Sequence, residues 1–436
     1  MSCKLDLENK LTNFLNNIDF NPQSKIAVAV SGGPDSMALA LTLKSQEKKY
    51  GYILYGIHVN HKLRSESDNE AQKVQEWMEK ANIPCTILDW DHPEIKTKIQ
   101  ETARQGRYEL LSNAAKEQNI KAIFLAHHKE DQYETVLYRL SCATGMDGLA
   151  GIPPVSIKDT IPYLRPFLSA SKRDLIQYLG AHSYIQDPSN SNDTYTRVKF
   201  RNQTDTLSAL GLTVDALVEV ADKASKNRIL IEELTTQVFE KYIEIHPLGY
   251  AVMSPALLKE VNPEIQYRVL ENLLMQIGGN SKFLRQKNIK EFIDKNLKNS
   301  IFKGDSIGNC LVRPYQKKWL FIREPEKIRD KKSLTTSLFW DNRFLISGLK
   351  KNPELYIAAL GKNWEKYKDF FARFADLPSY FWQTIPAIYD KTDKVLEIIV
   401  HDRKDSDILG QNVKIKFSPY CTRYQSIFDL EKRITL

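Results

Sequence analysis

A short turn, Ser31-Gly32-Gly33-Pro34-Asp35-Ser36, constrains the fold of this chain more than any other stretch. It follows an uninterrupted apolar run, Ile26 to Val30, and leads directly into a second apolar run that begins at Met37. Short runs rich in Val and Ile are typical of strands that are buried on both faces of a parallel sheet. The turn is therefore predicted to join the carboxyl end of a strand to the amino end of a helix.

A turn in that position can bind a phosphate group. Backbone N–H groups and the positive end of the helix dipole converge at the amino end of a helix. Gly32 and Gly33 let the backbone turn sharply and approach a ligand, and Pro34 suits the first helical position because its missing N–H is not needed there. A plain structural corner, with Asp35 as a partner of the helix dipole, is the alternative, and the local residues leave both interpretations open.

Asp35 distinguishes this turn from the Walker loop. That loop needs a longer Gly-x-x-x-x-Gly-Lys-Ser/Thr segment and its lysine, and the turn has neither. A carboxylate repels a bare phosphate, but it suits the position if Mg²⁺ lies between the two groups. If the turn binds a phosphate, Asp35 is the candidate ligand for Mg²⁺.

Predicted strands and helices alternate along the first part of the chain. Strands are predicted after the first one at 52–59, 84–90 and 122–126, and helices at 71–81, 98–118 and 129–140. This alternation predicts an α/β fold with a doubly wound parallel sheet. Ligands bind beyond the carboxyl ends of the strands in such sheets. The polar residues at those ends, His58 to Arg64 and His127-His128, are therefore expected to share one site with the turn.

A second polar motif, His127 to Thr135, opens the helix predicted at 129–140. Within it, Asp131 and Glu134 are three residues apart, which places them on one face near the amino end of the helix, with His127 close by. Two carboxylates there could hold Mg²⁺ or the ammonium group of an amine substrate. They could equally be first-turn partners of the helix dipole, and the motif alone does not decide between these roles.

The length of 436 residues allows roughly two to four domains. We predict a catalytic domain at 1–210, a mainly helical domain at 211–335 and a small α+β domain at 336–436. The clearest helix of the middle region has Asn262 as its cap, Pro263 as its first residue and Gly278 at its end. In the last region we predict one helix at 353–374 and strands at 395–400 and 413–417.

The net charge of +8 is unevenly distributed along the chain. Residues 281–330 contain thirteen Lys and Arg residues but only six Asp and Glu residues. A local excess of this kind suits a polyanion such as RNA, because clustered cations release the counterions of its phosphates. A solvated helix face with extended lysine side chains is the alternative, and charge alone slightly favours it.

The five cysteines are scattered, with no Cys-x-x-Cys pair, so neither a disulfide framework nor a zinc or iron–sulfur site is expected. No apolar stretch approaches the ~18 residues of a membrane span. The first ten residues lack the apolar centre of a signal peptide. We therefore expect a cytoplasmic protein that makes no membrane contact.

An ordered set of motifs resembles the tRNA(Ile)-lysidine synthetase family. The SGGPDS turn is similar to the signature loop of the PP-loop ATP pyrophosphatases, the superfamily to which that family belongs. The other matches follow in the order of the family: HVNHKLR (58–64), ETARQGRYELL (101–111), AHHKEDQYET (126–135), GLAGIPP (148–154), LRPFL (164–168) and DPSNSNDTYTRVKFR (187–201).

The resemblance implies ligation of free L-lysine to the wobble cytidine of an isoleucine tRNA with a CAU anticodon. ATP would adenylate the ring carbonyl with release of pyrophosphate, and the ε-amine of lysine would then displace AMP. The implied partners are tRNA(Ile), L-lysine and ATP, the implied cofactor is Mg²⁺, and both regions after residue 210 would contact tRNA. The oligomeric state stays open, with a homodimer as one option.

The resemblance also implies roles for individual residues. Phosphate binding is assigned to Ser31, Gly32, Gly33, Pro34 and Ser36, and Asp35 would act with Mg²⁺. The other catalytic residues would be Arg107, His127, Asp131 and Glu134, and the substrate-facing basic residues would be Arg197, Lys199 and Arg201.

Two other functions fit parts of the sequence. A PP-loop tRNA thiolase would also adenylate a pyrimidine, but such enzymes use catalytic or cluster-binding cysteines, often as Cys-x-x-Cys, which this chain lacks. A non-catalytic RNA-binding protein could keep a nucleotide-binding fold for structure. Asp35, Arg107, Asp131 and Glu134 together argue against that alternative, because a structural loop does not need them.

Overall fold

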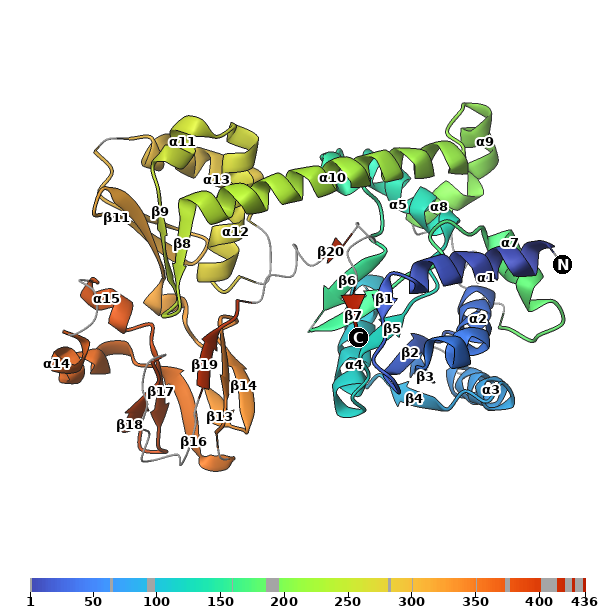
Figure 1. The fold of residues 1–436 in the computed structure, drawn as a ribbon, viewed down its shortest axis with the longest axis horizontal. Coiled ribbons are helices and arrows are strands. Elements are labelled where there is room, and N and C mark those ends of the chain that lie inside the picture. The colour runs from blue at the N-terminus through green and yellow to red at the C-terminus, as the bar shows by residue number, and fades with distance from the viewer. Residues whose placement is uncertain are drawn as a thin grey trace. The chain divides into compact units, whose positions relative to one another are not determined.

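A computed structural model describes the protein at residues 2–62, 66–91, 99–158, 160–185, 196–280, 284–299, 301–349, 351–372, 377–400, 414–419, 426–427 and 434–436. They group into two compact units, Met1–Leu230 with Arg423–Leu436, and Ile231–Thr422. Figure 1 labels most elements of both units. Within the described ranges, no helix combines the length and the apolar character that crossing a membrane requires.

The first unit contains a seven-stranded sheet with the order β20-β6-β7-β5-β2-β3-β4. Five neighbouring strands are parallel, which confirms the predicted doubly wound α/β fold. Two strands at one edge, β6 and β20, are antiparallel additions that the sequence did not predict. The bounds are β2 (Lys25–Ala29), β3 (Ile53–Asn60), β4 (Cys85–Asp89), β5 (Ala122–Phe124), β6 (Val155–Lys158), β7 (Ile161–Leu164) and β20 (Ser426–Ile427). A separate parallel pair joins β1 (Ile18–Asp19) to β21 (Ile434–Thr435).

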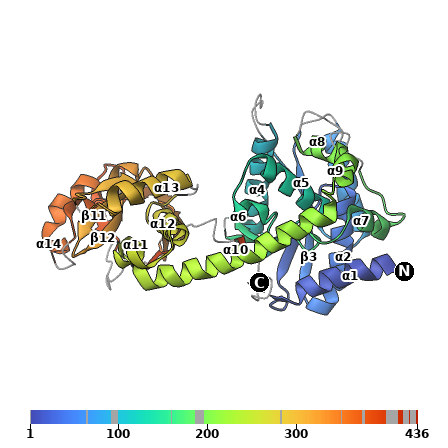
Figure 2. The same ribbon diagram turned by 90° about the horizontal axis from the view of Figure 1, so that it is seen from above.

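Helices cover both faces of this sheet (Figure 2). Ile26 and Val28 of β2 pack in one core with residues of α1, α2, α3 and α7. Ala27 packs in a second core with α4. Successive strand residues point to opposite faces, so burial on both faces explains why this segment is apolar throughout. The helices are α1 (Ser2–Leu15), α2 (Pro34–Tyr50), α3 (Ser67–Lys80), α4 (Ile99–Glu117), α5 (Lys129–Ser141), α6 (Met146–Leu149) and α7 (Lys172–Leu179).

A third core of the first unit packs α5 against later helices. Tyr133, Val136 and Leu137 of α5 contact Leu217 and Ala221. The helices that follow α7 are α8 (Thr196–Asn202), α9 (Thr204–Ala209) and α10 (Val214–Tyr242). This packing brings α8, which carries the predicted basic residues, against α5.

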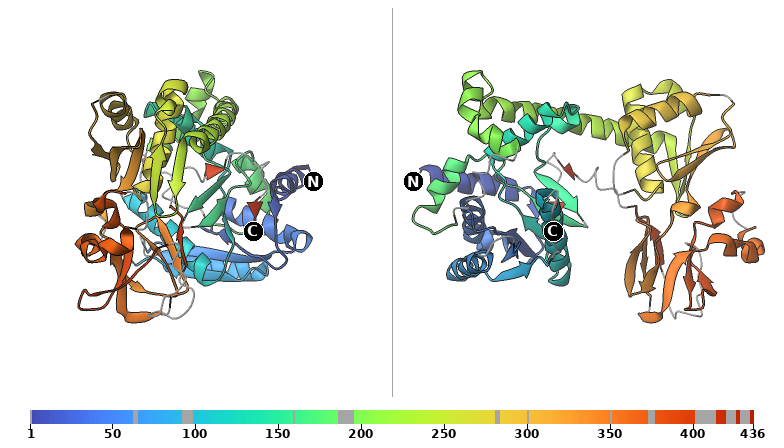
Figure 3. Two further views of the ribbon diagram at one scale, coloured as in Figure 1. Left: turned by 60° about the vertical axis from the view of Figure 1, so that its left-hand side comes forward. Right: turned by 180° about the vertical axis from the view of Figure 1, so that it is seen from behind.

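The second unit begins with a five-stranded antiparallel sheet of order β10-β11-β12-β9-β8 and the helices that pack on it (Figure 3). The strands are β8 (Ile243–His246), β9 (Tyr250–Met253), β10 (Asp305–Ile307), β11 (Cys310–Tyr315) and β12 (Lys318–Arg323). The helices are α11 (Ala256–Glu260), α12 (Pro263–Ile277) and α13 (Gln286–Phe292), followed by a π-helical turn at Ile293–Leu297. The predicted cap of α12 is confirmed, because Asn262 accepts a hydrogen bond from the Glu264 N–H.

The last region forms two antiparallel sheets. One contains β13 (Lys332–Leu334), β16 (Asn352–Ala359), β17 (Pro386–Tyr389) and β18 (Val395–Ile398), and the other contains β14 (Ser337–Trp340), β15 (Phe344–Ser347) and β19 (Lys414–Phe417). The strands predicted near 395–400 and 413–417 are confirmed as β18 and β19. Short helical segments complete the region at Gly361–Tyr367 (3₁₀), Lys368–Phe371 (α14) and Ser379–Trp382 (α15).

The helix predicted at 353–374 is wrong in its first part, where the chain forms β16. Ile357 pairs with Ile388 of β17, and the rings of Tyr356 and Tyr389 stack at 5.3 Å between centroids. Cross-strand contacts of this kind depend on a segment distant in sequence. They override a local preference for helix, which the sequence pattern alone reports.

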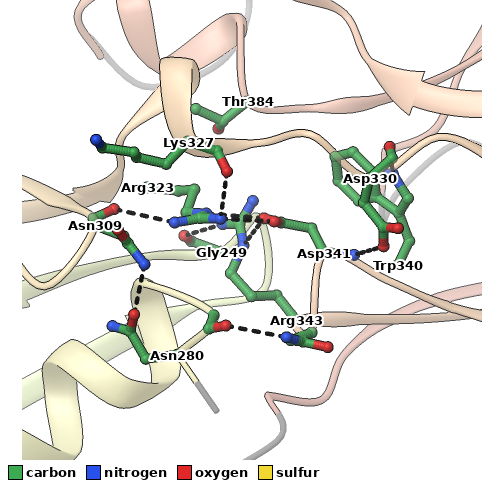
Figure 4. Close-up of polar contacts among 12 residues, drawn as sticks. Gly249, Asn280, Asn309, Arg323, Lys327, Asp330, Trp340, Asp341, Arg343 and Thr384 are labelled. Carbon is green, nitrogen blue, oxygen red and sulfur yellow. Dashed lines mark hydrogen bonds and ion pairs between the residues drawn. The ribbon is translucent and has the colours of Figure 1, made fainter. Parts of the chain in front are cut away.

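A buried carboxylate with two arginines connects the sheets of the second unit (Figure 4). Asp341, in the turn between β14 and β15, accepts hydrogen bonds from Arg323 of β12 at 2.9 and 3.0 Å. It also accepts one from Arg343 Nε at 2.7 Å. Arg343 is fully buried, and the other two side chains are nearly so. The fold can bury these charges because each arginine is paired with the carboxylate.

Candidate active site

The SGGPDS turn lies at the carboxyl end of β2 and leads into α2, as the sequence predicted. Gly32 has a φ of +88°, in the region that favours glycine. A Cβ atom added to Gly32 would lie 2.6 Å from Ile185 Cδ1 and 2.7 Å from Val74 Cγ2. The Ile185 N–H also donates to the Gly32 carbonyl at 2.8 Å. Conformation and space therefore both require glycine at this position.

The two serines of the turn hold its shape from within. The Ser36 hydroxyl donates to the Gly33 carbonyl at 2.9 Å and accepts from the Ser31 N–H at 3.2 Å. The hydroxyl oxygens of Ser31 and Ser36 also lie 3.2 Å apart. Pro34 is the first residue of α2, the position expected for a residue without an N–H. The amino end of α2 thus meets a loop whose conformation is fixed by internal hydrogen bonds.

The residues at the carboxyl end of β3 mainly serve the fold itself. His58 is buried, and its Nδ1 lies 2.8 Å from the Val30 carbonyl oxygen. Lys62 pairs with Asp89 at 2.9 Å. The last residues of the predicted His58 to Arg64 segment lie outside the described residues, as does 186–195 of the later motif.

His128 lies at the centre of an acidic cluster. The sequence analysis did not predict this role for His128. Its Nε2 is 3.6 Å from Asp35 Oδ2 and 3.5 Å from Asp131 Oδ2, and its Nδ1 is 2.9 Å from Glu130 Oε2. The His128 N–H donates to Asp131 Oδ2 at 2.9 Å, so Asp131 also caps α5. The turn after β2 and the start of α5 therefore meet at one side chain, His128.

Burial alone would lower the pKa of His128. The contacts with the carboxylates of Asp35, Glu130 and Asp131 outweigh burial and raise this pKa to about 10. The imidazole is therefore a cation at neutral pH, held between carboxylates.

Asp35 has one carboxylate oxygen available for a further partner. Its Oδ1 is buried and has no hydrogen-bond partner, whereas Oδ2 faces His128. Among the described residues, no group of three or more His, Cys, Asp or Glu side chains could hold a metal ion. Mg²⁺ commonly binds through one or two carboxylates together with phosphate oxygens and water, and Asp35 could supply such a carboxylate.

Glu134 and Arg201 form an ion pair. Arg201 Nε of α8 donates to Glu134 Oε1 of α5 at 2.8 Å, and Glu134 is only 5% exposed. Burial opposes the charge of Arg201, but pairing with Glu134 raises its pKa. Lys199 is exposed on α8, and Arg197 lies in the same helix. The pair thus joins a residue that was predicted to be catalytic, Glu134, to one that was predicted to face the substrate, Arg201.

Arg107 and His127 belong to a separate, cationic cluster. Burial and the positive charges of Arg165, Arg104 and Arg107 lower the pKa of His127 well below its ordinary value. Burial likewise lowers the pKa of Arg107. The predicted catalytic residues therefore fall into two groups, an acidic one around His128 and a cationic one around His127.

The backbone explains this division. His128 precedes α5 and is extended, with φ −127° and ψ −174°. Neighbouring side chains in extended backbone point to opposite sides, so His127 and His128 have different surroundings. Side chains alternate in direction along an extended segment, and this alternation after the strand was the sequence signal that could have identified His128. Arg165 lies in the LRPFL motif (164–168), but the sequence analysis assigned it no role, because its contacts with α4 come from a distant segment.

The two histidines should differ in charge at pH 8. We expect His128 to be protonated there and His127 to be neutral, because their pKa values shift in opposite directions. His128 binds its proton more tightly in the folded state, so its charge stabilises the fold below pH 6.5, and this contribution disappears as the pH rises through about 10. NMR of ring-labelled histidine would measure both titrations, with His128→Gln assigning the signals. A His128 signal that titrates near 6.5 would contradict the expectation.

Comparison with known proteins places these features in context. A family model described as a PP-loop domain matches residues 3–206. A tRNA(Ile)-lysidine synthase of Anaplasma marginale (strain St. Maries) is 32% identical over 330 residues, which cover 73% of this chain and 70% of that protein. The protein of the same name from Wolbachia sp. subsp. Brugia malayi (strain TRS) is 30% identical, covering 88% and 90%. That from Wolbachia pipientis wMel is 29% identical, covering 90% and 92%.

Proposed function

Because this chain belongs to the tRNA(Ile)-lysidine synthase family, we propose that it joins free L-lysine to the wobble cytidine of an isoleucine tRNA with a CAU anticodon. The chain is a ligase that uses ATP, and its reaction class is tRNA modification by a PP-loop ATPase. The observation that carries the finer proposal is the meeting of the SGGPDS turn with the acidic cluster around His128. A phosphate-binding turn and acceptors for an amine are thereby adjacent.

The first step would transfer AMP to the cytosine. The ring carbonyl oxygen attacks the α-phosphorus of ATP, an O–P bond forms, and the bond to pyrophosphate breaks. Backbone N–H groups of the turn and the amino end of α2 would stabilise the charge that develops on the leaving pyrophosphate. Mg²⁺ bound by Asp35 Oδ1 would supply further neutralisation of the phosphates. Arg107 would contact the α-phosphate or the adenylated base.

The second step would transfer the ring carbon from oxygen to nitrogen. The ε-amine of lysine forms the C–N bond, the C–O bond breaks, and AMP leaves with the oxygen that came from the cytosine. Only the neutral amine is a nucleophile, so its ammonium form must first lose a proton. Asp131 and Glu134, with neutral His127 nearby in sequence, are the candidates to hold the ammonium group and accept that proton. The pairing of Glu134 with Arg201 supports a positioning role for Arg201 in addition to contact with tRNA.

The remaining assignments are parts of the same proposal. Regions 211–335 and 336–436 would contact tRNA, as would Arg197 and Lys199. The enzyme would act in the cytoplasm, and a homodimer stays a prediction. The positive excess within 281–330 supports the assignment of the middle region, because RNA binding rewards clustered cations.

Lysine incorporation tests this proposal directly. Wild-type protein should transfer radiolabelled lysine to tRNA only when ATP is present, with one pyrophosphate released for each lysine. Asp131→Asn and Glu134→Gln should each lower incorporation by about 10²-fold or more, because the amine loses a proton acceptor. Release of pyrophosphate in a first turnover should fall less, since adenylation precedes lysine attack.

Glu117→Gln is a matched control, because Glu117 is an exposed carboxylate on α4. It should leave both readouts unchanged. Thermal unfolding would check that Glu134→Gln, which leaves Arg201 opposite a neutral group, stays folded. Near-wild-type incorporation by either site variant would remove that residue from the scheme. Lysine incorporation that never occurs with bulk tRNA would refute the function.

A further inference from the structure

Several cations surround the ring of Tyr108 on α4. The Lys158 Nζ lies 3.6 Å from the ring centroid, and the guanidinium carbons of Arg104 and Arg107 lie at 5.3 and 5.6 Å. Tyr108 itself is buried and contacts the ring of Tyr163 at 5.0 Å. The three cations come from α4 and β6, so the fold assembles this positive charge from two segments.

Arg165 adds a buried guanidinium beside this group. It is 4% exposed, and its Nη atoms donate to the carbonyls of Pro153 and Tyr163 and to the Ser156 hydroxyl at 3.0 to 3.3 Å. Its Nε, in contrast, is buried without a hydrogen-bond partner. The protein therefore fixes this side chain in place and leaves one donor unused.

Two neighbouring side chains also have a buried nitrogen atom that makes no hydrogen bond. Arg107 Nε and His127 Nδ1 are also buried without a hydrogen-bond partner. Arg104 Nη2 donates to the Tyr108 hydroxyl at 3.5 Å, but in the part of the chain that the structure describes no carboxylate pairs with Arg104, Arg107 or Arg165. A buried charge without a partner is costly, and so is a buried donor that makes no hydrogen bond. An anion from outside the chain would satisfy both requirements.

The number of cations indicates which kind of anion would bind here. A single amino-acid carboxylate would leave most of the positive charge uncompensated, whereas phosphate groups carry more charge and more acceptor oxygens. Guanidinium groups suit phosphate because their fixed donors can bind two of its oxygens at once. Arg104 is exposed and Arg107 and His127 are partly exposed, so the cluster is open to solvent at one side.

We propose that Arg104 and Arg165 extend the site beyond Arg107 and His127 and form with them a binding site for a phosphate group. This inference rests on the proposed function for the identity of the ligands. The phosphate would come from the RNA strand that carries the target cytidine or from the adenine nucleotide. In either case Arg104 and Arg165 are binding residues for the substrate.

Binding measurements with Arg104→Gln and Arg165→Gln test the site. Arg104 is exposed, so its replacement should not disturb folding, whereas Arg165 also holds loop carbonyls and needs a check by thermal unfolding. If the phosphate belongs to RNA, each variant should weaken tRNA binding by roughly 5- to 10-fold. The salt dependence of tRNA binding should fall by about one phosphate contact, and ATP affinity should not change. If it belongs to the nucleotide, ATP affinity should fall instead.

Lys116→Gln is the matched control, since Lys116 is an exposed cation on the same helix. It should change neither affinity beyond twofold. Unchanged binding of both tRNA and ATP by folded Arg104→Gln would overturn the inference. Binding of tRNA and ATP can be measured without lysine transfer. The binding test can therefore fail while the wild-type protein still incorporates lysine, and this result would overturn the phosphate site but not the proposed function.

Discussion

Asp35→Asn should lower ATP-dependent pyrophosphate release by roughly 10²- to 10³-fold. The substitution keeps the shape of the side chain but removes the charge that the phosphates and Mg²⁺ would meet at the buried Oδ1. It also removes one of the carboxylates that hold the proton on His128, so the pKa of that histidine should fall toward its ordinary value. Pyrophosphate release and the NMR titration of His128 would measure the two effects on the same variant.

Asp205→Asn provides the control for the structural alternative. Asp205 is exposed in the first turn of α9, just as Asp35 lies in the first turn of α2. If Asp35 only complements a helix dipole, the two variants should have similar and small effects, within about 1 kcal/mol on stability. A folded Asp35→Asn variant that releases pyrophosphate at the wild-type rate would contradict its assignment to the reaction.

Asp341→Ala should lower the free energy of unfolding of the second unit by about 3–5 kcal/mol. The change leaves the guanidinium groups of Arg323 and Arg343 buried without their carboxylate. Arg343 Nη2 already lacks a hydrogen-bond partner, so the remaining acceptors cannot compensate. Urea unfolding, followed by the tryptophan fluorescence of this unit, would measure the loss. ATP affinity should not change, because the SGGPDS turn belongs to the other unit.

Asp294→Ala removes a carboxylate from the same unit at an exposed position. Asp294 pairs with Lys298 on the surface at 2.7 Å, and exposed pairs of this kind contribute about 0.3–0.5 kcal/mol. The difference between the two variants isolates the effect of burial. A loss below about 1 kcal/mol for Asp341→Ala would show that the arginines find other partners or reach water.

The cysteines do not support the thiolase alternative. Burial raises the pKa of Cys310 to about 12 and that of Cys85 to about 11, so both are unreactive thiols at neutral pH. Cys85, Cys142 and Cys310 are all free, and Cys142 is exposed. Thiols in this state do not suit sulfur transfer, which needs a reactive thiolate or a metal cluster.

Local residue patterns determined much of the first unit. The apolar run before Gly32, the turn itself and the helix after it depend on contacts between near neighbours, and the structure has them where the sequence predicted. The cap at Asn262 was predictable for the same reason, because it involves residues two positions apart. In these segments the information that fixes the conformation lies within a few residues.

Only the tertiary structure showed which polar residues lie together. Asp35 lies beside His128, Glu134 pairs with Arg201, and Arg165 lies near Arg107, although the members of each pair are far apart in sequence. Conversely, His127 and His128 are adjacent in sequence but have different surroundings. The strand β16 likewise formed where a helix was predicted, because its partner strand begins at residue 386. Burial and charge pairing act through space and depend on the packing of the whole unit, whereas hydrophobic periodicity reports only the nearest turns of the chain.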